Sequence, residues 1–330
     1  MSKQRCFTAV IALIIITSSI MLKSEDKLGQ TGFQFLSVAN DARAAGMAEA
    51  VTGLEMNSTS LFFNPAGMAR MENNIEVSFS QNQWIANIKH NALCFAIAPK
   101  QGRYGVIGLT FRSIDYGEIQ GTKVWENTQG YLDTELMYPA AFSAGAGYAK
   151  YLTDKFSVGA QVNYTGQYLG KSTVPSGDTL AVKKNLAFST AIDFGTLYQT
   201  GFKSLMFGMS VRNFSQEVTF EEESFQLPLT FNIGVSMNVL DLFDMDPGLN
   251  SCVIAIDASH PRSYPELLNI GLEYLYLNTF AVRCGYKFVH DEQKYSFGVG
   301  VRKFGITVDY AYTPFGVFDT VQRFTFKINI

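Results

Sequence analysis

Hydrophobic and polar residues alternate along most of the chain after residue 74. Between residues 229 and 239 every second residue is large and apolar, and the residues between them are polar or glycine. Successive side chains of a β-strand point to opposite faces, so this period of two predicts a strand with one apolar and one polar face. The pattern recurs at residues 157–168, 280–288 and 323–330. An alternating strand is therefore the repeating unit of this region.

Fourteen segments have this strand pattern. They are residues 74–83, 88–98, 103–113, 138–152, 155–168, 184–199, 203–214, 227–239, 251–259, 266–276, 279–288, 294–303, 305–313 and 320–330. The polar faces are rich in Gly, Ser, Thr, Asn and charge, while the apolar faces often begin or end in Tyr or Phe, as expected when lipid lies outside. A soluble sandwich or soluble barrel is the alternative. We expect an all-β fold, a 14-stranded antiparallel transmembrane β-barrel over residues 74–330.

The connections between these segments support the same topology. If the first strand rises from the periplasm, the odd-numbered connections are extracellular, and they include the long ones at residues 114–137, 169–183 and 215–226. Most of the others are tight turns, and outer-membrane barrels have long outer loops and short inner turns. The inner connection at 240–250 is an exception that this rule does not explain.

Composition and the first residues point to export. Charged residues make up 17% of the chain, below the roughly 25% of soluble domains, and aromatic residues make up 14%. Lys3 and Arg5 precede an apolar run from Cys6 to Ile16, which is too short to span a bilayer. This pattern suits a secretory signal peptide over residues 1–24, and a membrane anchor is the alternative. We expect cleavage near residues 18–24 and a bacterial outer-membrane location. The net charge of −3 argues against a nucleic-acid partner.

The chain carries no pattern typical of a catalytic or metal site. His90, His260 and His290 are far apart in the sequence, and the cysteines have no CxxC spacing. We therefore expect no enzyme activity, no metal and no cofactor.

Residues 25–73 do not alternate, and they predict a plug inside the barrel. An Ala-rich stretch predicts a short helix that begins at Asn40 or Asp41 and stops at Gly53. In "SLFFNPAGMARM", residues 60–71, Asn64 at the N-cap and Pro65 at the first helical position predict a second short helix. The residues that we expect to form the plug are Arg43, Gly46, Asn64, Pro65, Ala66 and Gly67.

Two further sets of residues are candidates for function. Charges on the polar strand faces would pair with one another and with the plug, or would set the selectivity of a pore. The main ones are Arg212, Asp257, Glu273, Arg283, Arg302 and Asp309. Six apolar residues are candidate contacts for a hydrophobic ligand or a partner: Leu61, Phe62, Phe63, Met68, Phe315 and Phe318. We expect Phe315 and Phe318 to lie on an outer loop.

Three motifs give the chain a family resemblance. "ARAAGMAEA", then "SLFFNPAGMA" some twenty residues on, and later "LPLTFNIGVSM" resemble the PorV/PorQ family of outer-membrane proteins, within the FadL-like long-chain fatty-acid transporter superfamily. Two positions differ from the family pattern. The glycine pair that usually follows the methionine of the first motif is Ala48-Glu49 here, and the Tyr-Trp pair that usually precedes Asn-Pro is Phe62-Phe63. The resemblance implies a fourteen-stranded barrel with an N-terminal hatch.

The resemblance also implies two functions. The first is a docking or shuttle component of type IX secretion, whose partners would be outer-membrane lipid, secreted cargo and secretion machinery. The second is a FadL-like transporter that passes a hydrophobic small molecule through a plugged barrel. A structural barrel without transport is a third reading of the same strands.

Overall fold

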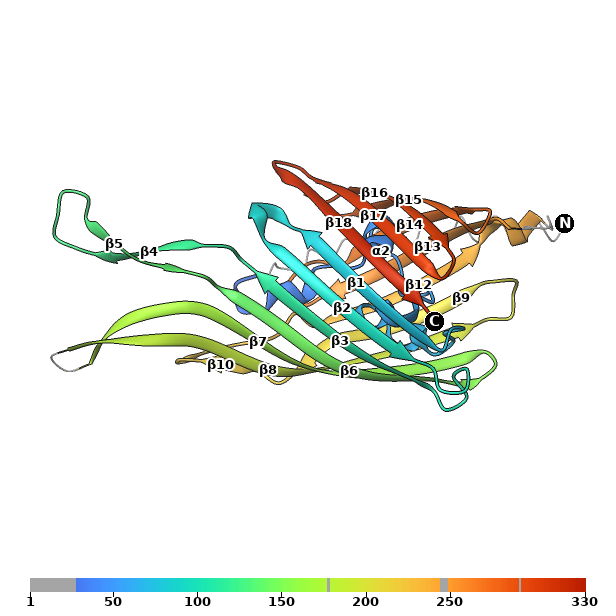
Figure 1. Ribbon diagram of the computed structural model, residues 1–330, viewed down its shortest axis with the longest axis horizontal. Helices are drawn as coiled ribbons and strands as arrows, with labels where there is room; N and C mark the ends of the chain where they lie inside the picture. The colour runs from blue at the N-terminus through green and yellow to red at the C-terminus, as the bar shows by residue number, and fades with distance from the viewer. Residues whose placement is uncertain (1–27, 177–178, 244–248, 291) are drawn as a thin grey trace.

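Fourteen antiparallel strands close into a barrel in a computed structural model that describes residues 28–176, 179–243, 249–290 and 292–330 (Figure 1). Each strand pairs with its neighbours in the chain, apart from the small hairpins β4–β5 and β10–β11, and β1 closes the barrel by pairing with β18. The wall strands are β1 Ile75–Gln83, β2 Lys89–Ile97, β3 Val106–Asp115, β6 Ala140–Thr153, β7 Phe156–Ser176, β8 Thr179–Gln199, β9 Met206–Ser215, β12 Thr230–Asn238, β13 Ser251–Pro261, β14 Leu267–Tyr276, β15 Phe280–Phe288, β16 Tyr295–Lys303, β17 Ile306–Phe315 and β18 Phe318–Asn329. The predicted fold is confirmed, strand by strand. The predicted signal peptide lies outside the described residues.

The two ends of the barrel differ in their connections. One end, here called the short-turn end, carries tight turns such as that between β16 and β17, where Gly305 has a φ of 76°. The expected exception at residues 240–250 also lies there. It begins with the 3₁₀ turn η6, Val239–Phe243, and continues partly outside the described residues.

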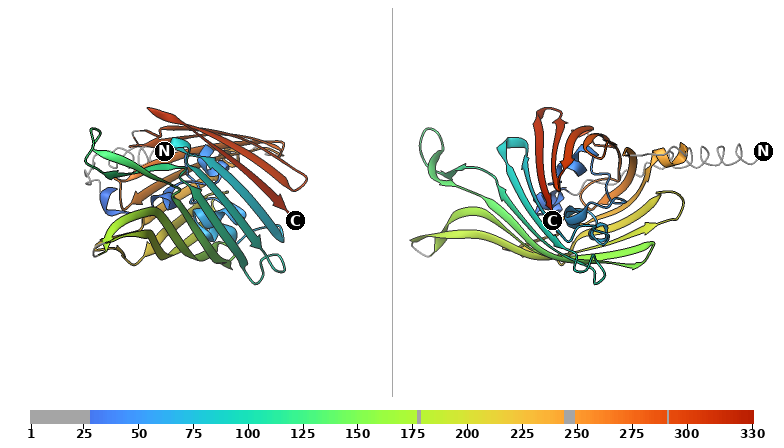
Figure 2. Two further views of the ribbon diagram at one scale, coloured as in Figure 1. Left: turned by 60° about the vertical axis from the view of Figure 1, so that its left-hand side comes forward. Right: turned by 45° about the vertical axis from the view of Figure 1, so that its right-hand side comes forward.

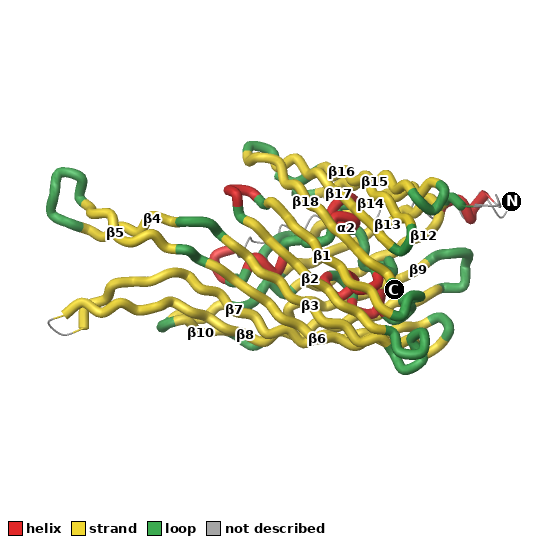
Figure 3. Tube along the Cα trace, viewed as in Figure 1, coloured by secondary structure: helices red, strands yellow, loops and turns green. Residues whose placement is uncertain are grey.

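The opposite end, here called the long-hairpin end, projects well beyond the wall (Figure 3). The segments expected as loops contain more strand than predicted. β4 Ile119–Val124 pairs with β5 Tyr131–Met137, β10 Val218–Phe220 pairs with β11 Glu223–Phe225, and β7 and β8 extend over most of residues 169–183. Water reaches both faces of β5, so its sequence has no reason to alternate, and the pattern used for the wall could not find it.

The wall itself follows the alternation closely. In β16 the small residues Ser296, Gly298 and Gly300 face inward and are buried, while Phe297 and Val299 face outward and are about half exposed. Apolar side chains exposed all round the wall suit contact with lipid chains. Among the described residues, no helix is both long and apolar enough to cross a membrane.

Residues 28–74, here called the lumen segment, lie between the walls of the barrel (Figure 2). The segment starts at the long-hairpin end, where Thr31 bridges to Gln226, and reaches the short-turn end, where Arg70 donates to the carbonyl of Asp154. Its helical turns are η1 Leu28–Gln30, η2 Gln34–Ser37, α2 Ala42–Gly46, η3 Asn57–Phe62 and η4 Pro65–Met68; a further 3₁₀ turn, η5 Ile85–Asn87, joins β1 to β2.

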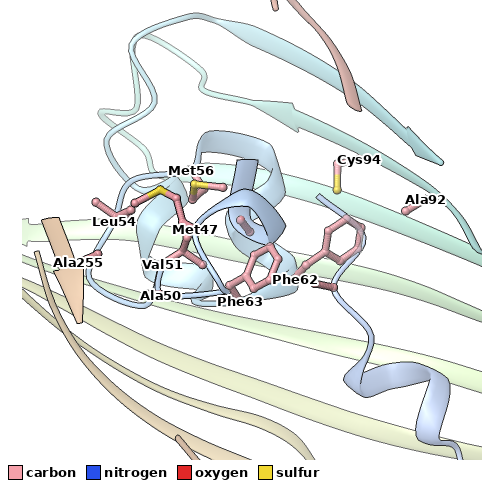
Figure 4. Packing of buried hydrophobic residues seen from close by; sticks show 12 residues of the cluster. Met47, Ala50, Val51, Leu54, Met56, Phe62, Phe63, Ala92, Cys94 and Ala255 are labelled. Carbon is pink, nitrogen blue, oxygen red and sulfur yellow. The ribbon is translucent and has the colours of Figure 1, made fainter. Parts of the chain in front are cut away.

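The buried apolar core of the molecule is built mainly by the lumen segment. Met47, Val51, Phe62 and Phe63 pack together, and the wall adds small residues such as Ala255 (Figure 4). A barrel wall that turns its large side chains to lipid leaves its inside lined by small and polar residues, so the segment supplies the bulk that fills it.

The first helix of the lumen segment is shorter than the sequence predicts. α2 ends at Gly46, seven residues before Gly53, because Ala48 and Glu49 adopt positive φ values of 52° and 64°. These two residues replace the glycine pair usual in the resembling family, and glycine adopts this left-handed conformation at no steric cost.

Candidate functional site in the barrel lumen

Asn64 makes the Asn-Pro corner a junction between three parts of the chain. Its Oδ1 accepts from the backbone N–H of Ala66 at 3.1 Å, which caps η4 as the sequence predicts. Its Nδ2 donates to the carbonyls of Thr52, at 2.7 Å, and of Thr196 on β8, at 3.0 Å. The side chain therefore ties the start of η4 to an earlier loop of the lumen segment and to the wall.

The wall has a seat for this corner. A Cβ built on Gly159 of β7 would lie 2.5 Å from the carbonyl carbon of Pro65, and one built on Gly195 of β8 would collide with Asn64. Real Cβ atoms do not come so close, so both positions require glycine for the corner to lie against the wall. Gly67 is confined on the other side, where a Cβ would lie 2.8 Å from the carbonyl of Leu54.

α2 is held at one end by a buried charge of the wall and at the other by close backbone packing. Asp41 caps the helix by accepting from the N–H of Ala44 at 2.9 Å, and its other oxygen lies 2.9 Å from Nζ of Lys327. Burial alone would raise the pKa of Asp41, but Lys327 and the Ala44 N–H hold it below its usual value of 3.8. Gly46 at the far end packs directly on Gly298 of β16.

Arg43 begins a chain of four alternating charges. Its Nε and Nη2 donate to the two oxygens of Glu273 at 2.8 and 2.6 Å, a bidentate pair. Glu273 also accepts from Arg283 at 2.5 Å, and Arg283 donates to Asp309 at 2.7 Å. The structure thus brings together three of the wall charges named from the sequence and joins them to the lumen segment.

Three further contacts hold the middle of the lumen segment. Oδ2 of Asp257 accepts from the N–H groups of Val51, at 3.0 Å, and Thr52, at 2.8 Å. Lys287 donates to Glu49 at 2.6 Å. Glu76 on β1 accepts from the Ser58 N–H at 2.9 Å and from the Asn57 side chain at 3.1 Å.

The remaining two wall charges named from the sequence behave differently from each other. Arg212 donates to the carbonyl of Leu36 at 3.3 Å, and its guanidinium lies 5.7 Å from the centre of the Phe63 ring. Arg302 is exposed and lines a cavity of about 350 Å³ at the short-turn end, which Arg43 and Glu273 also line.

The apolar candidates divide into a buried and an exposed group. Leu61, Phe62, Phe63 and Met68 are each no more than 4% exposed. Phe318 is 51% exposed on β18, near the turn to β17.

Phe315 corrects one expectation. It was expected on an exposed outer loop, but it ends β17, is 8% exposed, and its ring packs edge-on against Trp84 with 5.0 Å between centroids. The strand pair β17–β18 continues through a register shift to the Phe315–Phe318 bridge, which turns the Phe315 side chain inward.

The lumen segment leaves a cavity of about 520 Å³ towards the long-hairpin end, here called the outer cavity. Aromatic and aliphatic side chains line it together with polar and charged ones. Among them are Phe35, Phe63, Trp84, Arg212, Asp257 and Lys287. Sequence reasoning missed this cavity because half of its lining comes from segments without strand periodicity. Within the described residues, no group of His, Cys, Asp and Glu is placed to hold a metal ion.

A comparison with known protein families shows which family the chain belongs to. A sequence model of the family described as "Type IX secretion system membrane protein PorP/SprF" matches residues 56–317, most of the chain. The chain belongs to this family. The PorP/SprF family consists of secretion-system membrane proteins, not of enzymes, and it places the barrel in the outer membrane.

The PorP/SprF match revises the expected resemblance in one respect. The link to type IX secretion is supported, but the family shown is PorP/SprF and not PorV/PorQ specifically. The first motif, "ARAAGMAEA", lies before the matched range, so the match does not include it. No curated protein matches the chain.

Solved structures with the same fold include two toluene transporters and a FadL homologue. The Ralstonia pickettii toluene transporter TbuX is 13% identical, with a TM-score of 0.61, and the match covers 89% of this chain and 99% of that one. The Pseudomonas putida toluene transporter TodX is 12% identical, with a TM-score of 0.56 and coverage of 86% and 96%. A Pseudomonas aeruginosa FadL homologue is 12% identical, with a TM-score of 0.53 and coverage of 88% and 98%. At such low identities the likeness concerns the fold alone.

Proposed function

We propose that this PorP/SprF family member is a docking component of type IX secretion. The PorV/PorQ resemblance implies the same role. The long-hairpin end would face the cell exterior and hold secreted cargo or other secretion proteins. Residues 28–74 would act as a plug, so that the barrel serves as a platform and not as an open conduit. The signal peptide over residues 1–24 belongs to the same proposal, since it would export the chain.

The observation that carries this proposal is the exposed apolar surface on the β4–β5 hairpin. Val124 is 91% exposed and Trp125 is 51% exposed, although this hairpin projects beyond the wall (Figure 1). Large apolar side chains exposed away from lipid are typical of protein-interaction sites.

The charge of the long-hairpin end supports a protein partner with a basic surface. The connections at residues 114–139 and 215–229 together contain nine acidic residues and one lysine. Two of these acids, Glu135 and Glu221, pair with Lys171 and Lys183 of the β7–β8 hairpin, which leaves an acidic excess at this end. Charge of one sign on neighbouring connections steers a partner of the opposite sign and fixes its orientation.

Co-purification from native membranes tests the docking role. We expect the wild-type barrel to recover secreted proteins that share a C-terminal β domain, and the double substitution Val124→Ser, Trp125→Ser to reduce that recovery at least about tenfold, as loss of a central aromatic contact does. Phe304→Ser is the matched control, because Phe304 is 89% exposed on a turn at the opposite end. Recovery of the barrel alone, or equal losses in both variants, would contradict docking at this hairpin.

A second function, transport of a hydrophobic small molecule, is favoured by the outer cavity. Its volume of about 520 Å³ lies within the roughly 300–1,000 Å³ of ordinary small-molecule sites. Two toluene transporters, TbuX and TodX, have the same fold. Uptake of labelled toluene by cells with and without the protein tests it, and equal uptake rates would contradict it.

A further inference from the structure

Part of the lining of the outer cavity is a row of polar, inward-facing side chains on neighbouring strands. Asp257 on β13 lies opposite Asn269 on β14, and Asn269 lies opposite Lys287 on β15. Directly opposed side chains on adjacent strands have Cβ atoms about 5 Å apart, so the three groups form one continuous polar band. Gln293 extends this band, because its Oε1 accepts from Lys287 at 3.2 Å.

Three buried atoms of this band have hydrogen-bonding capacity that the described residues leave unused. They are Oδ1 of Asp257, Oδ1 of Asn269 and Nε2 of Gln293. All three side chains line the cavity and are at most 6% exposed. A buried polar group without a partner costs about 1–3 kcal/mol, so such groups are normally satisfied. Two of the three atoms are acceptors, and they call for a donor.

The charges around the cavity cancel. Arg212 and Lys287 are the cationic lining residues, Glu49 and Asp257 the anionic ones, and Lys287 and Glu49 already pair at 2.6 Å. A ligand that brought a full charge into this lining would leave one charge uncompensated, which is costly in a buried site. A carboxylate, moreover, would place acceptors against the acceptors of Asp257 and Asn269. A neutral head group that donates a hydrogen bond satisfies both conditions.

Apolar residues elsewhere in the lining suit an apolar body. Phe35, Phe63, Ile88 and Phe315 line the cavity, and Trp84 packs against Phe315 there. Aromatic and aliphatic linings with a few well-placed polar groups are characteristic of small-molecule sites.

The geometry points to a binding site in the outer cavity for an uncharged amphipathic small molecule, with a hydroxyl group on the Asp257–Asn269 pair and an apolar chain or ring system against Trp84 and Phe315. This site goes beyond the docking function and does not depend on it. The site should prefer a hydroxylated ligand to a pure hydrocarbon such as toluene or to a fatty-acid carboxylate, because neither of those offers a donor to the two acceptors. It therefore narrows the class of molecule that the transport function would carry.

Trp84 provides a direct readout. The chain has two tryptophans, and Trp125 lies away from the cavity on the β4–β5 hairpin, so Trp125→Phe leaves Trp84 as the sole indole. Bromine quenches indole fluorescence on contact. The detergent-solubilised protein is titrated with 10-bromodecan-1-ol, 1-bromodecane and 10-bromodecanoate at equal mole fractions in the micelle. We expect saturable quenching by the alcohol at lower mole fraction than by the other two.

Substitutions at Asn269 test the proposed hydrogen bond. Asn269→Leu should weaken binding of the bromo-alcohol about three- to tenfold, the effect of one neutral hydrogen bond, and leave bromodecane unaffected or better bound. Asn269→Gln retains a neutral amide acceptor and should bind the alcohol more tightly than Asn269→Leu does. Asn329→Leu is the matched control, because Oδ1 of Asn329 also has no partner among the described residues but Asn329 lies at the short-turn end.

Several results would overturn the proposal. They are equal quenching by all three probes, stronger quenching by the carboxylate, no saturable quenching by any probe, and equal effects of Asn269→Leu and Asn329→Leu. Heat-modifiable migration on gels verifies that each variant is folded, so a loss of binding reports on the site. Failure of docking in the co-purification experiment would leave these fluorescence results unchanged.

Discussion

Replacement of Asn64 by alanine tests whether the Asn-Pro corner fixes the lumen segment to the wall. The change removes three hydrogen bonds at once, one to Ala66 and one each to the carbonyls of Thr52 and Thr196. Loss of the cap costs about 1 kcal/mol. Each of the other two bonds contributes about 1 kcal/mol. Together we expect local stability around residues 57–69 to fall by about 3 kcal/mol.

Hydrogen–deuterium exchange with mass spectrometry measures this locally. A loss of about 3 kcal/mol should accelerate exchange about 100-fold in peptides from η3 and η4, since each 1.4 kcal/mol is a factor of ten. Exchange in the wall strand β16, far from the corner, should be unchanged and serves as the internal control.

Asn64→Asp separates the cap from the other two bonds. Aspartate retains the acceptor for the Ala66 N–H but cannot donate to the carbonyls of Thr52 and Thr196. The wall-anchoring account therefore predicts exchange as fast as in the alanine variant, or faster. If Asn64→Asp exchanges like wild type, the corner is only a helix start and the reasoning is refuted.

Three further expectations follow from the contacts of the lumen segment. Gly195→Ala should destabilise the lumen segment by about 1–3 kcal/mol in the same exchange measurement, because the added methyl group overlaps the Asn-Pro corner. Gly166→Ala is the control and should have little effect, because its methyl group would meet lipid-facing aromatic side chains. Glu273→Gln removes the anion between two guanidinium groups, so it should destabilise the protein by about 3–5 kcal/mol and lower its temperature of thermal unfolding. Glu266→Gln, at an exposed position, is the control and should leave that temperature unchanged. Equal unfolding temperatures for the two variants would argue against the charge chain. The pKa of Asp41 is held below 3.8, so the stability that its carboxylate contributes is present above that pH and is lost as the pH falls further. The difference in unfolding temperature between wild type and Asp41→Asn should therefore be level from pH 8 to 5 and shrink below about pH 4, and a difference that shrinks already above pH 6 would contradict this origin.

The wall could be predicted from the sequence because a single physical constraint shapes it. Every wall strand separates lipid from the lumen, so each one alternates, as Phe297 and Gly298 on β16 illustrate. The β4–β5 hairpin escaped prediction because no such separation exists beyond the rim.

The contacts of the lumen segment were only partly predictable. Alternation marks Glu273 and Asp257 as inward-facing, and Asn64 before Pro65 marks a cap. Nothing in the local pattern pairs Glu273 with Arg43, which is 230 residues away, or Lys287 with Glu49. Such pairs depend on how the segment descends through the barrel, and tertiary packing alone decides that.

The sequence also did not predict the positive φ angles of Ala48 and Glu49. Both residues favour helix, and the propensity of this stretch predicted a helix up to Gly53. The wall overrides that preference, because Lys287 holds the side chain of Glu49, and Ser296 accepts from the Ala48 N–H at 3.0 Å. Helix propensity is a weak constraint compared with several buried contacts.

Ion conductance across a planar lipid bilayer tests the central claim, that residues 28–74 close the barrel because the wall clamps them. Glu76, Asp257 and Glu273 are the wall carboxylates that hold three successive parts of the segment. We expect the wild-type barrel to conduct little and the triple variant Glu76→Gln, Asp257→Asn, Glu273→Gln to show frequent open events. A wild-type barrel that conducts as a steady open pore, or a triple variant as silent as wild type, would contradict the clamp.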